Sequence, residues 1–232
     1  MAFLTKVDPF GLASNTLAVK STSDGTSSSI AEAMDEDGTI VAQTAFGTRM
    51  SPSADYALKA ETEFEDIQLG AVNTYKTKRV VLTNLQINTS AGGEPTISAS
   101  GEEIEAASSG TCPATYTVPD FTLGVCHHAK ILFSAFTYTG SGCHLNSANY
   151  TAACENGTAT VEGEVVAHGV YGAYLECTAE FVATSGTTPT VTPGSGWAVS
   201  SALSETNPDA EYPTYSITLR KPLEKDSASS SS

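Results

Sequence analysis

Apolar and polar side chains alternate along several segments of the chain, which is the pattern of β-strands with one buried face. Between residues 173 and 182 every second side chain is apolar, and Tyr174, Glu176, Thr178 and Glu180 occupy positions between them. The apolar positions are Leu175, Cys177, Ala179 and Phe181. Because successive side chains of a strand point to opposite faces, a half-buried strand is predicted here. Residues 215–220 alternate in the same way, residues 79–87 are a further β-rich run, and residues 130–138 have apolar side chains on both faces.

Dipeptides that end in glycine separate several β-rich segments and indicate hairpin turns. Residues 156–157 are Asn-Gly, the favoured sequence of a type I′ turn, and lie between two such segments. Residues 37–38 are Asp-Gly and are expected to turn the chain between residues 30–34 and 39–46. Residues 162–163, Glu-Gly, introduce one more strand.

Helical periodicity is scarce along the chain. Residues 60–69 and 102–107 are the candidates for a short helix. The sequence therefore predicts an all-β fold with at most one or two short helices, arranged as an antiparallel β-sandwich or barrel.

Composition divides the chain into one β-rich domain and less regular flanks. Residues 1–29 are expected to be an N-terminal arm and flexible loop, because residues 21–29 consist largely of Ser, Thr, Gly and Asp. Residues 30–222 form the single domain, with an inserted lobe considered at 108–156 and a linker-like loop rich in Thr, Pro and Gly at 184–195. Residues 223–232 end in a run of serines and are expected to be a disordered tail.

The charge balance limits the partners that the protein can have. The 232 residues include 26 acidic and 11 basic ones, for a formal net charge of −15. Such a polyanion is repelled by DNA and by anionic membranes, so specific nucleic-acid binding is not expected. The start of the chain carries Lys6 and Asp8 and no apolar run follows, so we expect no signal peptide and folding in a cytoplasm. No apolar segment is long enough to predict a membrane span.

The basic residues fall into two short clusters, which are interpreted either as contacts between copies of the chain or as solubilising surface charge. They are Lys76, Lys78 and Arg79, and Arg220, Lys221 and Lys225.

Sequence motifs of common catalytic and cofactor sites are missing. The chain has no phosphate-binding loop, no dinucleotide fingerprint and no nucleophile elbow, and the two Gly-Ser-Gly triplets at 140–142 and 194–196 are interpreted as turns. Residues 35–38 (DEDG) lack the ligand spacing of a calcium loop and are better explained as a hairpin turn. The carboxylates Glu102, Glu103 and Glu105 are interpreted as solvated charges. We therefore predict no enzyme activity, no catalytic residue and no bound cofactor.

Cysteine and histidine residues gather in the middle of the chain and raise the alternative of a zinc site. They are Cys112, Cys126, His127, His128, Cys143, His144 and Cys154. Their spacing does not match known zinc patterns, and neighbouring histidines on a strand point to opposite faces. With Cys177 the cysteines number five, an odd count without a CxxC pair. Reduced, metal-free thiols are therefore predicted in preference to a zinc site or a Cys/His dyad.

Several segments resemble bacteriophage major tail proteins, also called tail tube proteins. The likeness is carried by residues 33–47 (AMDEDGTIVAQTAFG), 56–70 (YALKAETEFEDIQLG), 80–101 (VVLTNLQINTSAGGEPTISASG), 157–168 (GTATVEGEVVAH) and 190–219, which include Trp197. The resemblance implies a β-barrel-like subunit with a flanking helix that forms rings, usually hexameric. The rings stack into a hollow tube through which DNA passes.

The resemblance also implies the partners and the location of the protein. Its partners would be further copies of itself and other tail proteins, DNA would transit the lumen without specific binding, and the protein would reside in the virion tail after assembly in the host cytoplasm. The family has no catalytic residues, and the section 112–154 is not expected of it. The alternatives are a capsid decoration or tail-fibre β-domain that binds a partner or host glycan, and an enzyme or metalloprotein.

Overall fold

The computed structural model describes residues 7–34, 40–104, 114–125, 128–161, 164–207 and 210–226, and this part of the chain is all-β with antiparallel pairing throughout. The predicted fold class is therefore confirmed. The strands are β1 (Leu17–Met34), β2 (Ile40–Leu58), β3 (Thr62–Phe64), β4 (Gln68–Leu69), β5 (Val72–Tyr75), β6 (Lys78–Ser90), β7 (Thr96–Glu103), β8 (Tyr116–Thr117), β9 (Phe121–Leu123), β10 (Phe136–Thr139), β11 (Cys143–Val161), β12 (Glu164–Ala183), β13 (Thr190–Pro193), β14 (Ala198–Glu205) and β15 (Thr214–Pro222).

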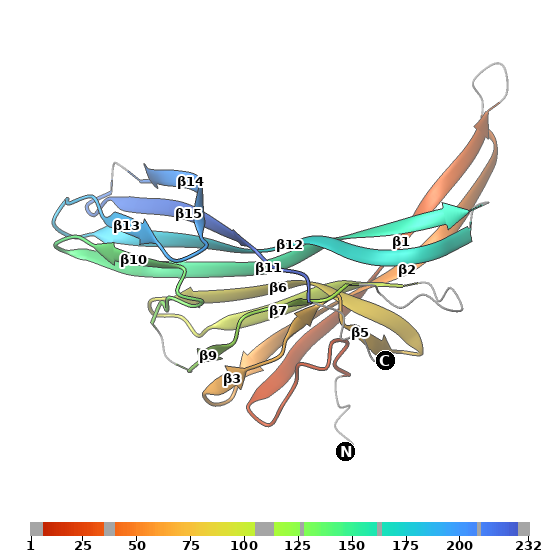
Figure 1. Ribbon diagram of the computed structural model, residues 1–232, viewed down its shortest axis with the longest axis horizontal. Helices are drawn as coiled ribbons and strands as arrows, with labels where there is room; N and C mark the ends of the chain where they lie inside the picture. Colours follow the sequence, from red (N-terminus) through yellow and green to blue (C-terminus); the bar gives the residue numbers. More distant parts are fainter. Residues whose placement is uncertain are drawn as a thin grey trace.

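Nine of these strands form one large sheet, in the order β1-β2-β7-β6-β11-β12-β15-β14, with β5 pairing additionally with β6. Three short ribbons accompany it, β10–β13, β3–β9 and β4–β8. The first two are labelled in Figure 1. The section after the linker-like loop returns to the sheet, because β15 pairs with β12 along its whole length from Thr214 to Pro222. The sheet path begins at β1 and ends at β14, so each of these strands has a neighbour on one side.

The buried face of the sheet is built from apolar residues that stand in register across neighbouring strands. One row crosses six strands and is at most 2% exposed throughout. It consists of Tyr56, Ile97, Ile87, Tyr150, Cys177 and Leu219. The short ribbons belong to the same core, since Phe64 of β3 stacks on Phe121 of β9 at a centroid distance of 4.6 Å. Burial of each such side chain contributes about 1.5–3 kcal/mol.

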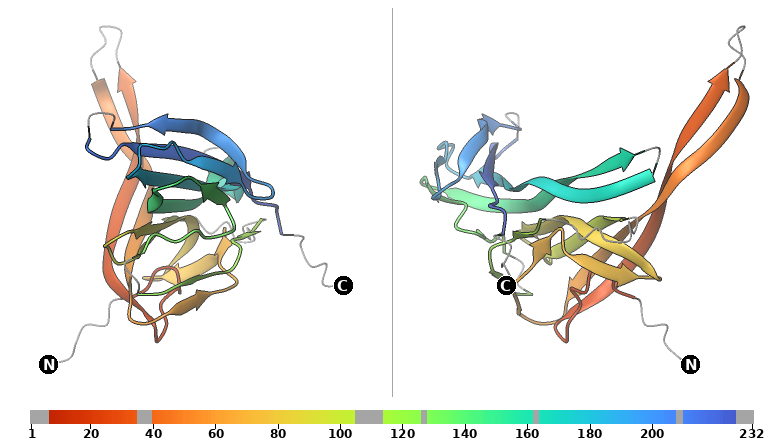
Figure 2. Two further views of the ribbon diagram at one scale, coloured as in Figure 1. Left: turned by 90° about the vertical axis from the view of Figure 1, so that its left-hand side faces the viewer. Right: turned by 45° about the vertical axis from the view of Figure 1, so that its right-hand side comes forward.

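Two hairpins extend beyond the neighbouring strands that pair with them in the main sheet. The β1–β2 pair extends from Leu17↔Leu58 to Met34↔Ile40, whereas β7 pairs with β2 only over residues 53–56. The β11–β12 pair continues to Val161↔Glu164, whereas β6 and β15 leave it at Ala153 and Tyr174. Both hairpins therefore project from the body of the protein (Figures 1 and 2).

The prediction of a flexible loop at residues 21–29 is wrong. These residues lie in β1 and pair with β2, from Ser21↔Asp55 to Ser29↔Phe46. Small hydroxyl side chains resemble a loop in composition, but they are compatible with a strand whose partner supplies the ladder of backbone hydrogen bonds.

The short helix considered at residues 60–69 is not formed, and the alternative at 102–107 is not helical in its described part. The first segment contains β3 and β4, because β9 and β8 pair with them and tertiary pairing overrides a weak helical period. In the second, Glu102 and Glu103 close β7, and residues 105–107 lie outside the described residues.

Turn chemistry predicted one hairpin correctly and misplaced another. The strands on either side of residues 37–38 pair as expected, although the dipeptide itself lies outside the described residues. Residues 156–157 do not turn: Gly157 pairs with Gly169, and the hairpin continues to residues 162–163. The long partner strand β12 outweighs the local preference of Asn-Gly.

Three further boundaries differ from the expectation. Only Phe136–Thr139 of the segment 130–138 is a strand, because Phe133 and Ser134 adopt left-handed backbone angles, with φ of 55° and 48°. The loop expected at 184–195 contains β13, which pairs with β10. A lobe over 108–156 is wrong in its second part, because β11 lies between β6 and β12 in the main sheet.

The described start of the expected tail is also ordered. Asp226 accepts a hydrogen bond from the Thr117 hydroxyl at 3.0 Å, and Leu223 packs against the core. The expectation of disorder over residues 223–232 is therefore wrong for residues 223–226, and residues 227–232 lie outside the described residues.

Candidate functional site

The cysteines that suggested a zinc site do not converge where the structure describes them. The Cys143 thiol donates a hydrogen bond to the carbonyl of Thr187 at 2.9 Å, and the Cys154 thiol donates to the carbonyl of Thr83 at 3.6 Å. Cys143 and Cys177 are free thiols. Among the described residues, no three His, Cys, Asp or Glu side chains gather as metal ligands. Residues 35–38, Glu105, Cys112, Cys126 and His127 lie outside the described residues.

Two of the predicted histidines do share a surface recess. His128 and His144 both line an open hollow of about 380 Å³, together with Tyr138 and Lys130. Lys130 is directed elsewhere, because its ammonium donates to the carbonyl of Thr122 at 2.6 Å. Among the described residues, the recess brings together two imidazoles but not the thiol of Cys143.

The largest organised polar feature is the face of the main sheet opposite the core. One row of side chains runs in register across six strands and is exposed or half-buried. It consists of Thr96, Asn88, Asn149, Thr178, Thr218 and Ser201. Hydrogen bonds link members of this row, from Asn88 to Thr96 at 3.3 Å and between the hydroxyls of Thr178 and Thr218 at 3.3 Å.

A second row on the same face crosses all eight strands of the sheet path. It consists of Ser21, Asp55, Ser98, Gln86, Thr151, Glu176, Arg220 and Ala198. We call these two rows, together with the adjacent Glu180, the polar face. Its carboxylates outnumber its cation: Asp55, Glu176 and Glu180 lie there with Arg220, whose guanidinium stacks 3.5 Å from the centre of the Tyr174 ring.

Two carboxylates of the polar face, those of Asp55 and Glu180, accept side-chain hydrogen bonds. Asp55 accepts hydrogen bonds from the Ser21 hydroxyl at 2.6 Å and the Ser98 hydroxyl at 2.8 Å, and these two donors lower the pKa of its carboxyl group. Glu180 accepts a hydrogen bond from the Asn146 amide at 2.7 Å. The Asp55 carboxyl group is therefore ionised at neutral pH.

The free edge at β14 carries mostly exposed side chains. Val199 is 49% exposed, although it stands in register with the buried Leu219 of β15. Backbone groups on the open side of an edge strand are a template for pairing with another chain.

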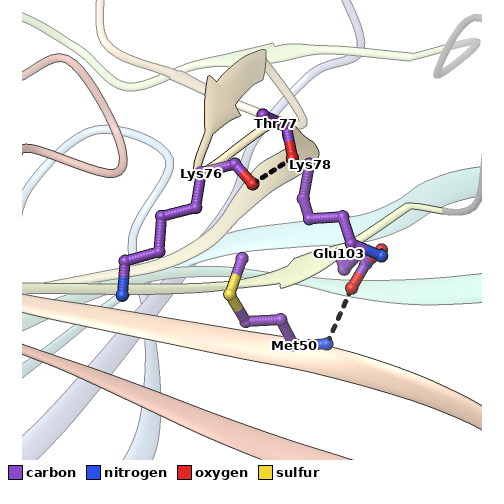
Figure 3. Close-up of polar contacts among 5 residues, drawn as sticks. All are labelled: Met50, Lys76, Thr77, Lys78 and Glu103. Carbon is purple, nitrogen blue, oxygen red and sulfur yellow. Dashed lines mark hydrogen bonds and ion pairs between the residues drawn. The ribbon is translucent and has the colours of Figure 1, made fainter.

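The root of the β1–β2 hairpin is held by a polar cluster. The Glu103 carboxylate is 7% exposed and accepts hydrogen bonds from the Lys78 ammonium at 2.6 Å and from the Met50 amide at 3.0 Å (Figure 3). Lys76 pairs with Asp24 of β1, and this bond lowers the pKa of the Asp24 carboxyl group. Both lysines, expected as contacts between copies or as surface charge, therefore bind carboxylates of their own chain.

Comparisons with protein-family models and with curated proteins found no relative. No protein-family model matches the chain, and no curated protein sequence matches it significantly. In the described part of the chain no helix is long and apolar enough to cross a membrane.

Sequence reasoning predicted strands at residues 79–87, 173–182 and 215–220, which contribute to the polar face, but it placed Ser21 in a loop and did not identify the face itself. The rows depend on the register among strands far apart in the sequence. The signal that was available is the polar set of every alternating segment, such as Glu176 and Thr178 in residues 173–182.

Proposed function

We propose that this chain is a structural virion protein that assembles into stacked rings and forms the tube of a phage tail. The observation that carries the proposal is the single open sheet, whose path ends at β1 and β14 and whose polar face is left uncovered from one edge to the other. A ring of copies would pair these edges and so remove the exposed backbone groups that a monomer must otherwise protect.

The polar face suits the inner surface of such a tube. Its hydroxyl and amide groups stay hydrated, and Asp55, Glu176 and Glu180 repel the phosphates of DNA. With a net charge of −15 per copy, the protein offers a passing genome little to bind. The projecting hairpins would reach beyond one ring and contact the next.

Electron microscopy and sedimentation of the purified full chain test the proposal. Rings or tubes are expected for the unaltered protein. A protein that remains monomeric or trimeric at all concentrations would contradict the proposal and favour the alternative of a capsid decoration or tail-fibre domain.

A shortened hairpin separates ring formation from stacking. Ser27 and Arg49 are register partners, so residues 28–48 can be replaced by Asn-Gly, which closes the hairpin with a two-residue turn. We expect the shortened protein to keep its fold and form rings but no longer stack into tubes. Tubes of normal length from this variant would contradict the role of the hairpin.

An edge substitution tests ring formation with a matched control. Val199→Asp places a charge at the apolar position of β14, and Ser201→Asp adds the same charge on the opposite face of the same strand. Pairing of the β14 edge would bury Val199 more completely, so only Val199→Asp is expected to shift the protein from rings to monomers. Equal effects of the two variants would contradict pairing at this edge.

A further inference from the structure

The backbone amides of β2 point alternately to β1 and to β7, and two hydrogen bonds fix which residue points to which side. The amide of Lys59, directly after β2, donates to the carbonyl of Thr16 before β1 at 2.8 Å. The amide of Met50 donates to Glu103 of β7 at 3.0 Å. Because successive residues of a paired strand alternate in this way, odd-numbered residues of β2 face β1 and even-numbered residues face β7.

The outer edge of β1 has a regular stretch whose amides point away from the hairpin. Between residues 21 and 27 the register has no shift, and odd-numbered residues of β1 are opposite odd-numbered residues of β2. The amides of Thr22, Asp24 and Thr26 therefore point away from β2. The sheet path ends at β1, so no described strand pairs with it on this side. We call residues 21–27 the β1 edge segment.

Other outward groups of the same hairpin are closed to a further strand. Near the start of β1, Leu17 donates its amide to the Ser14 hydroxyl at 3.2 Å, and its carbonyl accepts the Ser14 amide at 2.9 Å. On the outer side of β2, Pro52 has no amide hydrogen, and the amide of Met50 is bound by Glu103 (Figure 3). Proline and lysine are residues that commonly protect a sheet edge, and the β1 edge segment contains neither.

Strand β14, at the other end of the sheet path, matches the β1 edge segment in length and direction. It has eight residues, and its outer side is also without a described partner strand. The path from β1 to β14 contains eight strands with antiparallel pairing at every step, so β14 runs opposite to β1. Rotation of a copy about an axis along the strands keeps their directions. In a ring, β14 of one copy therefore meets β1 of the next copy in antiparallel orientation.

The faces of the two edge strands agree with this orientation. Thr22, whose amide points outward on β1, is opposite a buried residue of β2 and lies on the core face. The amide of Thr206, directly after β14, donates to the carbonyl of Thr214, so the amide of Glu205 points outward. Glu205 is opposite the buried Tyr215 and lies on the core face as well. Antiparallel pairing thus joins the outward amides and keeps both core faces on one side.

We propose that the β1 edge segment accepts β14 of a second copy as an added antiparallel strand, and that the β2 edge at the root of the same hairpin does not accept one. The inference rests on the proposed ring and specifies which backbone groups hold it together. Asp24 is the one acidic residue of the segment, and Lys76 of its own chain already pairs with it. The approach of Glu205 from the second copy is therefore opposed by little charge at this edge.

A proline substitution with a matched control tests the backbone contact. Proline is tolerated in an edge strand where its nitrogen faces solvent, so Thr22→Pro keeps the ladder to β2 and removes one outward donor. Thr22→Ala removes the same side chain and keeps the amide. In sedimentation at one concentration we expect rings from the unaltered protein and from Thr22→Ala, and monomers from Thr22→Pro with an unchanged circular dichroism spectrum. Rings from Thr22→Pro as abundant as those from Thr22→Ala would overturn the inference.

Thr26→Pro replaces Thr22→Pro if the latter does not fold, because the amide of residue 26 also points outward. Thr26→Ala is then the matched control, and the same two outcomes decide.

Hydrogen exchange measured by mass spectrometry locates the contact without a substitution. The assembled protein is compared with dilute monomer, and peptides covering residues 21–27 and 198–205 are expected to gain protection on assembly. Residues 49–56, which already lie between β1 and β7, are the internal reference and should show no gain. Rings without added protection at residues 21–27 would overturn this inference and leave the proposed function in place. A protein that never assembles would overturn both.

Discussion

Glu103 on β7 accepts a hydrogen bond from the backbone amide of Met50 on β2, at an N···O distance of 3.0 Å. The ladder between these strands runs from Tyr56↔Ile97 to Ser53↔Ser100, and its continuation places Met50 opposite Glu103. Pro52 lies between and has no amide hydrogen to donate. The Glu103 carboxylate thus replaces a backbone carbonyl as hydrogen-bond acceptor at the point where the β1–β2 hairpin leaves the sheet.

Glu103→Ala is expected to lower the free energy of unfolding by about 1–3 kcal/mol, because the amide of Met50 loses its acceptor at a buried site. Glu103→Gln keeps an acceptor oxygen and should cost less. Chemical denaturation measures both effects, and Glu63→Ala on β3, whose side chain is exposed, is the control. Equal stabilities of Glu103→Ala and Glu63→Ala would show that the hairpin root does not depend on this bond.

Gly70 and Gly92 have nearly the same backbone conformation but different surroundings, with φ of +85° and +86°. A Cβ on Gly92 meets no atom within 4 Å, whereas one on Gly70 would lie 2.6 Å from the Ala114 carbonyl oxygen and from Val170 Cγ2. Gly92→Ala should therefore cost only the left-handed strain, about 1–2 kcal/mol. Gly70→Ala should cost about 1–3 kcal/mol more, because the overlap must be relieved. Thermal and chemical unfolding compare the two variants directly. Similar losses in the free energy of unfolding would mean that the surroundings of Gly70 accommodate the added methyl group without cost.

The buried thiol of Cys177 should be inert in the folded protein. Burial raises its pKa to about 12, so almost none is thiolate at pH 8, and the thiolate is the reactive species. A thiol reagent at pH 8 should therefore modify Cys177 only after denaturation, when all five cysteines react. Mass analysis of the labelled protein locates the modified sites. Rapid labelling of native Cys177, an intact-mass deficit from disulfides or stoichiometric zinc would each contradict the prediction of reduced, metal-free cysteines.

Strands with one buried face could be predicted from the sequence, because burial of one face makes apolar residues alternate with polar ones. In β12, Leu175, Cys177 and Phe181 are at most 1% exposed and alternate with half-buried polar residues. The segment 21–29 in β1 has no such period, and its residues 22–26 are exposed in a hairpin that leaves the sheet. The composition of residues 21–29, rich in Ser and Thr, is typical of a loop and led to the wrong prediction.

The candidate surfaces depend on relationships that no single segment encodes. Asn88 and Asn149 are opposite each other on β6 and β11, yet 60 positions of sequence separate them, and only the register joins them into the polar face. Local turn chemistry also misled at residues 156–157, where long-range pairing extends the hairpin.

Assembly of the proposed rings should strengthen as salt is raised from low to physiological concentration. Each copy has a net charge of −15, so association brings like charges together, and the charges of the polar face converge in a closed ring. At physiological ionic strength the Debye length is about 8 Å, and this repulsion is then largely screened between exposed groups. Ladder hydrogen bonds and apolar contacts at the edges are much less sensitive to salt and then dominate. Light scattering and sedimentation across a salt series measure the balance. Assembly that weakens steadily with salt would contradict this account of the electrostatics, although the oligomer would remain. It would mean that attraction between opposite charges, rather than pairing of edge strands, holds the copies together.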